Sequence, residues 1–351
     1  METMLEVIKS IPNLINMQID KSEIMKERFK EIKFDTIVVV ASGSSYNAAF
    51  AAKVFSEENL GLKIEIYYPN YFYNHVLPQN INKKNLYVFI SQTGKTKTVL
   101  ETIKVIKKLG GMTLALTESK LAPIAKSAKY SFEIGSNNEP YVFRTSGYTL
   151  SVVTMLMLLL QIAENNKVIS EKEHQNYLIE IDNISKDLPR IIQQAEDWYE
   201  DHKKEMSSAN AFLFAGGGDL WPTAQEAEMK FMEMVPVITK SYEIEEIIHG
   251  PQNSFKKGMV FFLMAEQKED IEKAERIHDF IYNEITQNIF VISRNIESAD
   301  FKPLINSIHF FSIGYITFLQ VLSYLTATDN NRDLSKTMFP QITKYINKTV
   351  K

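Results

Sequence analysis

The sequence predicts an α/β protein with two domains, each a doubly wound, mostly parallel sheet flanked by helices in three layers. The chain has 351 residues, about twice the length of a common domain of ~150 residues. Short runs rich in β-branched residues alternate with helical patterns, as in parallel sheets covered by helices. A strand, a loop of small residues and a helix follow one another around Gly43 and again around Gly217, half the chain apart. This distance indicates two copies of one domain rather than a short solenoid repeat.

The first half contains four runs of strand length, of which the first is continuously apolar and rich in β-branched residues, and we expect such strands to be buried on both faces. They cover residues 36–41, 62–68, 86–91 and 112–117. Helical patterns cover residues 45–58, 96–109 and 122–126. Gly110-Gly111 stands where the second of these helices should end, because glycine commonly terminates helices.

The α/β pattern pauses in the middle of the chain and then restarts. Helices are expected from about residue 146 to 165 and, with more charge, from about residue 170 to 204. Strands follow at 211–215, 259–265 and 288–293, with helices at 222–234 and 271–285. The pattern therefore predicts an N-terminal domain over residues 1–168, a helical linker over 169–204 and a C-terminal domain over 205–351.

Composition and charge exclude several functional classes. The net charge is -4, from 39 basic and 43 acidic residues, whereas nucleic-acid-binding domains usually carry a basic excess. The absence of cysteine excludes disulfides, thiolate metal sites and a cysteine nucleophile, and it fits a cytoplasmic protein. No cluster of His, Asp and Glu has metal-ligand spacing. We therefore expect no nucleic-acid partner, no metal and no cofactor.

The sequence also contains no clear membrane or export signal. Residues 1–13 include Glu2 and Glu6 and no long apolar core, so they do not form a signal peptide. The most apolar stretch, residues 150–162, has 13 residues, where a membrane-spanning helix needs about 20. We expect this stretch to be a buried helix and expect no membrane partner.

Two loops have the composition of a phosphate site. Ser42-Gly43-Ser44-Ser45 and Ser91-Gln92-Thr93-Gly94-Lys95-Thr96 each follow a strand and open a helix. A helix N-terminus offers free N–H groups to an anion, and the carboxyl ends of parallel strands meet at one edge of the sheet. Simple helix capping by serine is an alternative. A dinucleotide site is less well supported, because the GxGxxG spacing is absent and Tyr67 and Tyr68 stand where an acidic residue would be expected.

Longer motifs along nearly the whole chain resemble one family. In order they are MLEVIKSIPNLI, GSSYNAA, SQTGKT, LALTES, EPYVFRTSGYT, GGGDLWPTAQEAEMKFME, EIEEIIHGP and DNNRDLSK. The pattern resembles the SIS (sugar isomerase) domain, in particular the tandem-SIS isomerase half of glucosamine-6-phosphate synthase and its stand-alone relatives. The resemblance implies two SIS domains, of which the first holds the sugar phosphate.

The resemblance assigns site residues position by position. The implied phosphate contacts are Ser45, Ser91, Gln92, Thr93 and Thr96. Other implied substrate-site residues are Gly43, Ser44, Val142, Glu226 and Ser335. Two positions depart from the family pattern: Lys95 replaces a usual glutamate, and Thr145-Ser146 replaces a usual Thr-Lys.

The assignment of catalytic residues rests on a helical spacing and on the resemblance to the family. Glu226, Lys230 and Glu233 stand at i, i+4 and i+7, on one face of a helix, where a merely solvated face is the alternative. Proton transfer between C1 and C2 of a sugar needs a positioned carboxylate, and the residue that matches Glu233 is that base in the family, with Lys230 as its neighbour.

Two further residues take their roles from the family. His249 precedes a Gly-Pro turn, where a structural histidine is the alternative, and imidazole suits sugar-ring opening near neutral pH. In the family the matching histidine comes from the neighbouring subunit of a dimer. Lys336 lies in a tail that folds over the active site in the family, and the matching lysine can form an imine with an open-chain keto sugar.

The resemblance thus implies a cytoplasmic homodimer that isomerises or deaminates an amino-sugar or keto-sugar phosphate such as glucosamine 6-phosphate or fructose 6-phosphate. Without cysteine, no hydrolysis of glutamine is expected. One alternative is a fructosamine-6-phosphate deglycase, although such proteins tend to lack the Arg-x-Leu-x-Lys tail. The other is a non-catalytic sugar-phosphate-binding regulator. The retained Glu233 and His249, and a sequence without an added helix-turn-helix segment, favour the enzyme.

Overall fold

The computed structural model describes residues 2–34, 36–77, 81–137 and 139–350. The chain divides into two compact units, each described here by itself. We call Asn13–Asp182 with Lys336–Lys351 the N-terminal unit, and Met1–Pro12 with Asn183–Ser335 the C-terminal unit. The division therefore falls at Asp182, inside the region expected as a linker, and each unit includes one end of the chain. Met1 and Lys351, the outer bounds of the expected domains, lie outside the described residues.

The N-terminal unit contains a five-stranded parallel sheet in the order β2-β1-β3-β4-β5. Its strands are β1 (Thr36–Ala41), β2 (Lys63–Tyr67), β3 (Asn85–Ile90), β4 (Met112–Thr117) and β5 (Tyr130–Glu133). The four runs of the first half are thus confirmed as strands, but β2 is not buried on both faces, because it lies at the sheet edge and only Ile64 of its five residues is buried. The short strand β5 was not expected, because only Phe132 of its four residues is fully buried.

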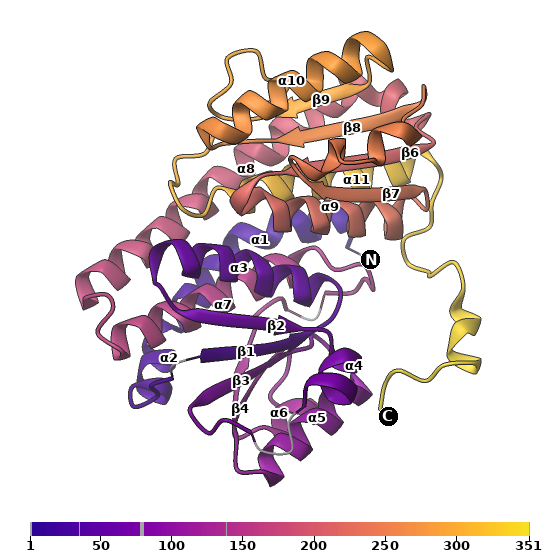
Figure 1. Cartoon of the computed structure of the whole chain (residues 1–351). Coiled ribbons are helices and arrows are strands. Elements are labelled where there is room, and N and C mark those ends of the chain that lie inside the picture. The colour runs from indigo at the N-terminus through magenta and orange to yellow at the C-terminus, as the bar shows by residue number, and fades with distance from the viewer. Residues whose placement is uncertain (1, 35, 78–80, 138, 351) are drawn as a thin grey trace. The chain divides into compact units, whose positions relative to one another are not determined.

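Helices cover both faces of this sheet (Figure 1). They are α2 (Ser22–Phe29), α3 (Ser44–Asn59), α4 (Pro69–Tyr71), η1 (Phe72–Val76), α5 (Lys97–Lys108), α6 (Pro123–Ser127) and α7 (Ser146–Asn165). Side chains of α5 and α6 pack with alternate residues of β1, β3 and β4 in one core cluster, while α3 contacts α7, β1 and β2. The alternation buries successive side chains on opposite faces, which explains the uninterrupted apolar sequence of these strands.

The C-terminal unit contains a four-stranded parallel sheet in the order β7-β6-β8-β9. Its strands are β6 (Ala211–Gly216), β7 (Ile238–Glu243), β8 (Met259–Met264) and β9 (Ile289–Ile292). Helices and turns are α9 (Trp221–Met234), α10 (Lys268–Glu284), α11 (Ser312–Asp329) and the 3-10 segments η2 (Gly218–Leu220), η3 (Glu246–Ile248) and η4 (Pro251–Ser254). The order repeats that of the first four strands in the other sheet, so the expectation of two doubly wound parallel sheets is confirmed.

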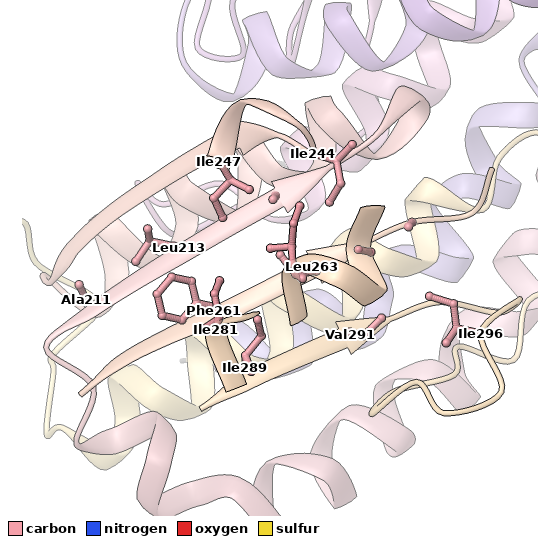
Figure 2. Close-up of a cluster of buried hydrophobic side chains, with 14 residues drawn as sticks. Ala211, Leu213, Ile244, Ile247, Phe261, Leu263, Ile281, Ile289, Val291 and Ile296 are labelled. Carbon is pink, nitrogen blue, oxygen red and sulfur yellow. The ribbon is translucent and has the colours of Figure 1, made fainter. Parts of the chain in front are cut away.

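Two different clusters of buried side chains pack against the two faces of this second sheet. Figure 2 shows one cluster, in which Leu213, Phe261 and Val291 from three strands lie with Ile281 of α10. The opposite face is aromatic: Phe214 and Phe262 stack with ring centroids 5.6 Å apart. Trp198, Phe231 and Phe318, from α8, α9 and α11, pack within the same aromatic cluster.

Two further long helices and a short 3-10 segment remain to be placed in the described chain. Helices α1 (Met4–Ile19) and α8 (Glu171–Ser207) contain the divisions between the units, and the 3-10 segment η5 (Pro340–Lys344) lies in the tail. Helix α7 is long and apolar enough to span a membrane by length and composition, but its apolar window is 100% buried. It therefore packs as a core helix, as expected for the stretch from 150 to 162.

Candidate functional site

The two hydroxyl-rich loops follow neighbouring strands, β1 and β3, at the point where the order of strands in the sheet reverses. Strand β1 lies between β2 and β3, and Ala41 at the end of β1 is level with Ile90 at the end of β3. Ligands of doubly wound sheets bind in the crevice outside such a switch point. The structure therefore places Ser42–Ser45 and Ser91–Thr96 after adjacent strand ends at the same edge of the sheet.

Gly43 turns the first loop into helix α3. Its φ of +57° lies in the region that favours glycine. Its carbonyl accepts the N–H groups of Tyr46 at 2.8 Å and Asn47 at 3.1 Å. Ser44 and Ser45 form the first turn of α3, where N–H groups have no acceptor within the helix. This first turn can therefore donate to an anion.

The second loop is closed by its own hydroxyl groups. The Oγ of Ser91 and the Oγ1 of Thr96 lie 3.0 Å apart. Gly94 has a φ of +63°, and a Cβ there would lie 2.5 Å from the Cβ of Ala122. Thr93 is exposed, and its Oγ1 accepts a bond from the N–H of Lys95 at 3.4 Å. The loop is compact and needs glycine at this bend.

Gln92 is held by hydrogen bonds with Thr117, Glu118 and Ser136. Its carbonyl accepts bonds from the N–H of Glu118 and the hydroxyl of Thr117, both at 2.9 Å. Its side-chain Nε2 donates to the Oγ of Ser136 at 2.9 Å, and that hydroxyl donates to the Glu118 carboxylate. A chain of hydrogen bonds therefore orients this side chain.

Glu139 was not singled out from the sequence, although it stands in the EPYVFRTSGYT motif. It is buried and accepts bonds from Thr145 N at 2.7 Å and Gly147 N at 3.0 Å. These N–H groups belong to the start of α7, so this carboxylate caps that helix and occupies its anion-favouring end. Val142, a predicted substrate-site residue of the same loop, is 55% exposed.

Helix α9 of the C-terminal unit brings the predicted acid–lysine–acid group together. The Nζ of Lys230 lies 3.0 Å from Oε2 of Glu233 and 3.5 Å from Oε1 of Glu226. The side chains of Lys230 and Glu226 are 0% exposed, whereas that of Glu233 is 34% exposed. A buried ammonium is costly unless it is paired. Its carboxylate partners satisfy that need, and Glu233 is the partner that solvent reaches.

His249 lies after η3, at the surface of the C-terminal unit. Its side chain is 57% exposed, and its Nε2 is 3.6 Å from Oε1 of Glu245. The Nζ of Lys273 lies 2.6 Å from the other oxygen of that carboxylate. These neighbours lower the pKa of Glu245, mainly through the hydrogen bond from Lys273 and then through His249. Gly250 has a φ of +117°, which explains the glycine after the histidine.

The two predicted tail residues, Ser335 and Lys336, belong to different units. Ser335 is the last residue of the C-terminal unit, and its hydroxyl donates to Asp333 Oδ1 at 2.6 Å. Lys336 is exposed and begins the segment that belongs to the N-terminal unit. The sequence-predicted residues thus form two hydroxyl-rich loops in one unit and a carboxylate–lysine group in the other. No group of three or more potential metal ligands occurs in the part of the chain that the structure describes.

Residues 32–165 match the SIS domain family. Among curated proteins, the chain is 24% identical over 351 residues to glutamine–fructose-6-phosphate aminotransferase (isomerizing) of Fusobacterium nucleatum subsp. nucleatum, covering 95% of this chain and 57% of that protein. It is 26% identical over 344 residues to the enzyme of the same name from Wigglesworthia glossinidia brevipalpis, covering 93% of this chain and 55% of that protein. The chain therefore spans little more than half the length of these curated relatives.

Solved structures share the fold along nearly the whole chain. A candidate phosphosugar isomerase from Clostridium difficile 630 has a TM-score of 0.92 at 20% identity, covering 99% of both chains. The C-terminal domain of glucosamine-fructose-6-phosphate aminotransferase from Francisella tularensis has a TM-score of 0.84 at 19% identity, covering 94% of this chain and 96% of that one. Glucosamine-6-phosphate deaminase from Thermotoga maritima has a TM-score of 0.74 at 21% identity, covering 97% and 99%. The chain therefore contains a SIS domain over residues 32–165, and it shares its two-sheet fold with these solved structures along nearly its whole length.

Proposed function

We propose that this protein isomerises or deaminates an amino-sugar or keto-sugar phosphate by moving a proton between C1 and C2. The observation that carries the proposal is the 3.0 Å contact between the buried Lys230 and the partly exposed Glu233. A general base must be ionised and accessible, and a fixed neighbouring cation favours the ionised form. A plain solvated helix face would not bury its lysine completely.

The proposed steps use residues of this chain only. Hydroxyl and N–H groups of the loops at Ser45 and at Ser91–Thr96 bind the phosphate. His249 protonates the ring oxygen and opens the sugar, and Glu233 takes the proton from one carbon and returns it to the other. Lys336 forms an imine with the keto sugar, releasing water, and hydrolysis later restores the amine. Deamination differs only in that water replaces the substrate amine at C2 and ammonia leaves.

The proposal includes a homodimer in the cytoplasm, with His249 acting in the site of the other subunit. Its support is the family and the exposed position of His249, whose only ion pair in the described part of the chain is with Glu245. A fructosamine-6-phosphate deglycase would use the same carboxylate but release an amine from a sugar adduct. A regulator would bind the phosphate without any reaction.

A substrate screen tests the proposal. Glucosamine 6-phosphate, fructose 6-phosphate and phosphorylated fructosamines are incubated with the protein in D2O, and ammonia, amine and isomerised sugar are measured. We expect turnover of the first two with deuterium at C1 or C2, and no turnover by Glu233→Gln. Amine release from adducts alone would establish the deglycase. Sugar-phosphate binding with no reaction in any case would establish the regulator and reject the proposed enzyme.

A further inference from the structure

The last residues of the chain pair with the second phosphate loop. The N–H of Lys97 donates to the carbonyl of Lys348 at 3.0 Å, and the N–H of Val350 donates to the carbonyl of Lys95 at 2.8 Å. Between these bonds, Thr96 faces Thr349 in an antiparallel bridge. Both partners belong to the N-terminal unit. The segment Lys348–Val350, called the strand Lys348–Val350 below although its contact is an isolated β-bridge, thus holds the loop backbone on both sides of Thr96.

The pattern of these bonds determines which side chains are neighbours. Both hydrogen bonds flank the pair of threonines instead of joining them, which is the closer type of antiparallel pair, with side chains on a common face. The Thr96 hydroxyl on that face lies 3.0 Å from the Ser91 hydroxyl. The side chain of Thr349 therefore lies on the face that carries two of the proposed phosphate contacts.

The pairing also concentrates positive charge. Lys95, Lys97 and Lys348 are the three residues whose backbone groups, with Val350, make the bridge. No ion pair joins these lysines to a carboxylate in the described part of the chain. Because successive side chains of paired extended segments point to opposite faces, these three lysines lie on the face opposite to Thr96 and Thr349. Residues 335–349 are exposed, and the backbone bonds of this bridge attach their end to the loop.

We infer that the strand Lys348–Val350 is part of the phosphate subsite. It holds Lys95–Lys97 in the shape that binds the phosphate and adds the hydroxyl of Thr349 to those of Ser91 and Thr96. Because the effect of one equilibrium on another is reciprocal, phosphate binding and docking of the strand favour each other. The inference rests on the proposed phosphate site, but not on the role of Lys336, which lies well before this strand.

Proline substitution separates the bridge from the helix. Lys97 is the first residue of α5, where proline is tolerated because the N–H has no acceptor in the helix. Thr96 before it has an extended ψ of 115°, as a residue before proline requires. Lys97→Pro therefore removes the donor to Lys348 and leaves α5 intact. Lys268→Pro is the matched control, because Lys268 is the first residue of α10 and follows Gln267 with ψ 147°.

Calorimetric titration with inorganic phosphate measures the coupling. We expect Lys97→Pro and deletion of residues 347–351 to weaken binding by about fivefold or more, in the usual range of coupling between sites, and Lys268→Pro to leave it unchanged. Thr349→Val, which keeps the shape of the side chain but lacks its hydroxyl, should also weaken binding, and Thr349→Ser should restore it. Hydrogen exchange at the Lys97 N–H should slow when phosphate is added.

Each negative result in these titrations rejects a different part of the inference. Wild-type affinity in both Lys97→Pro and the deletion variant would overturn the role of the strand and leave the phosphate loops in place. Wild-type affinity in Thr349→Val, with weakened binding in Lys97→Pro, would reject the hydroxyl contact and the inference as stated. If the wild type binds no phosphate, or binds it equally after Ser91→Ala/Thr96→Ala, the proposed phosphate site itself is rejected together with this inference.

Discussion

The α-carbon of Gly147 lies so close to Gln92 that a Cβ at this position would be 2.2 Å from the Oε1 of the amide. Gly147 is in the first turn of α7, and its N–H donates to the buried carboxylate of Glu139. The glycine therefore leaves the space in which Gln92 reaches Ser136. The identity of residue 147 thus controls the position of a predicted phosphate contact.

Gly147→Ala should consequently weaken phosphate binding. Either Gln92 leaves its hydrogen bond to Ser136 or the helix moves, and such overpacking commonly costs about 1–3 kcal/mol of stability. Phosphate titration and urea unfolding measure the two effects. The same substitution in a Gln92→Ala background is the control: it should cost clearly less there, and an equal cost in both backgrounds would show that Gln92 is not the residue displaced.

Lys230→Met should destabilise the C-terminal unit strongly. Removing one partner leaves the fully buried carboxylate of Glu226 without its cation, and losses of this kind reach about 3–5 kcal/mol. Urea unfolding at pH 7 gives the free energy of unfolding. The double variant Glu226→Gln/Lys230→Met should recover part of the loss, since no buried charge remains. A Lys230→Met protein as stable as the wild type would contradict the buried ion group.

Mixing two inactive variants tests the proposed sharing of His249 between subunits. Glu233→Gln and His249→Ala should each be inactive alone. After subunit exchange, a mixed dimer has one site with both functional groups, so part of the activity should return. Exchange is verified by mass spectrometry of differently tagged subunits. If exchange is complete and activity stays absent, the histidine acts within its own subunit or has no catalytic role.

Borohydride trapping tests Lys336. An imine between this lysine and a keto sugar phosphate is reducible while it exists. Borohydride together with substrate should inactivate the wild type and attach the sugar to the tail peptide, as peptide mass mapping would show. Lys336→Arg keeps the charge and cannot form the imine, so it should resist inactivation. Labelling of another lysine instead would assign the imine elsewhere.

Acid should weaken the contact between His249 and Glu245, because the carboxylate of Glu245 becomes protonated. The pKa of Glu245 is lowered by Lys273 first and by His249 second. A carboxyl with a lowered pKa in the folded protein stabilises the fold above its unfolded pKa, and that contribution is lost as the pH falls through the folded value. Lys273→Met should raise the pKa of Glu245. NMR titration of the side-chain carbonyl measures this shift, and an unchanged pKa would contradict the observed contact.

The sequence predicts well where burial follows composition. Strands β1 and β4 begin and end at the expected residues because both of their faces are buried, so that most of their side chains are apolar. Helix α7 is also found at its expected bounds. The fold class and the repeated strand–loop–helix units follow from these elements.

Strand β7 was missed because its inward side chains are polar. Thr239 and Ser241 are buried, whereas Ile238 is 78% exposed. Glu228 of α9 accepts bonds from the N–H and the hydroxyl of Ser241, and its carbonyl accepts one from Thr239. The buried hydroxyls are thereby satisfied by a helix that the local sequence of the strand does not reveal.

Helix α11 was missed for the opposite reason. It is apolar on all sides and rich in Leu, Thr, Ile and Tyr, so that no 3.6-residue periodicity marks it. The residues of the candidate site also fall into two groups, those marked by a local sequence pattern and those brought together only by the fold. The hydroxyl loops and the i, i+4, i+7 group are local patterns that a sequence displays. The bonds of Gln92 to Ser136 and of Lys97 to Lys348 join distant segments, and nothing in the local pattern of either segment indicates the other.

The exchange of terminal segments has a consequence for dissecting the protein. Met1–Pro12 belong with residues after 183, and Lys336–Lys351 belong with residues before 182. A single proteolytic cut beside Asp182 in α8 would therefore give two fragments, each carrying a piece of the other's fold. Each fragment would therefore lack one terminal segment of its own unit, so that one cut separates neither unit with all of its elements.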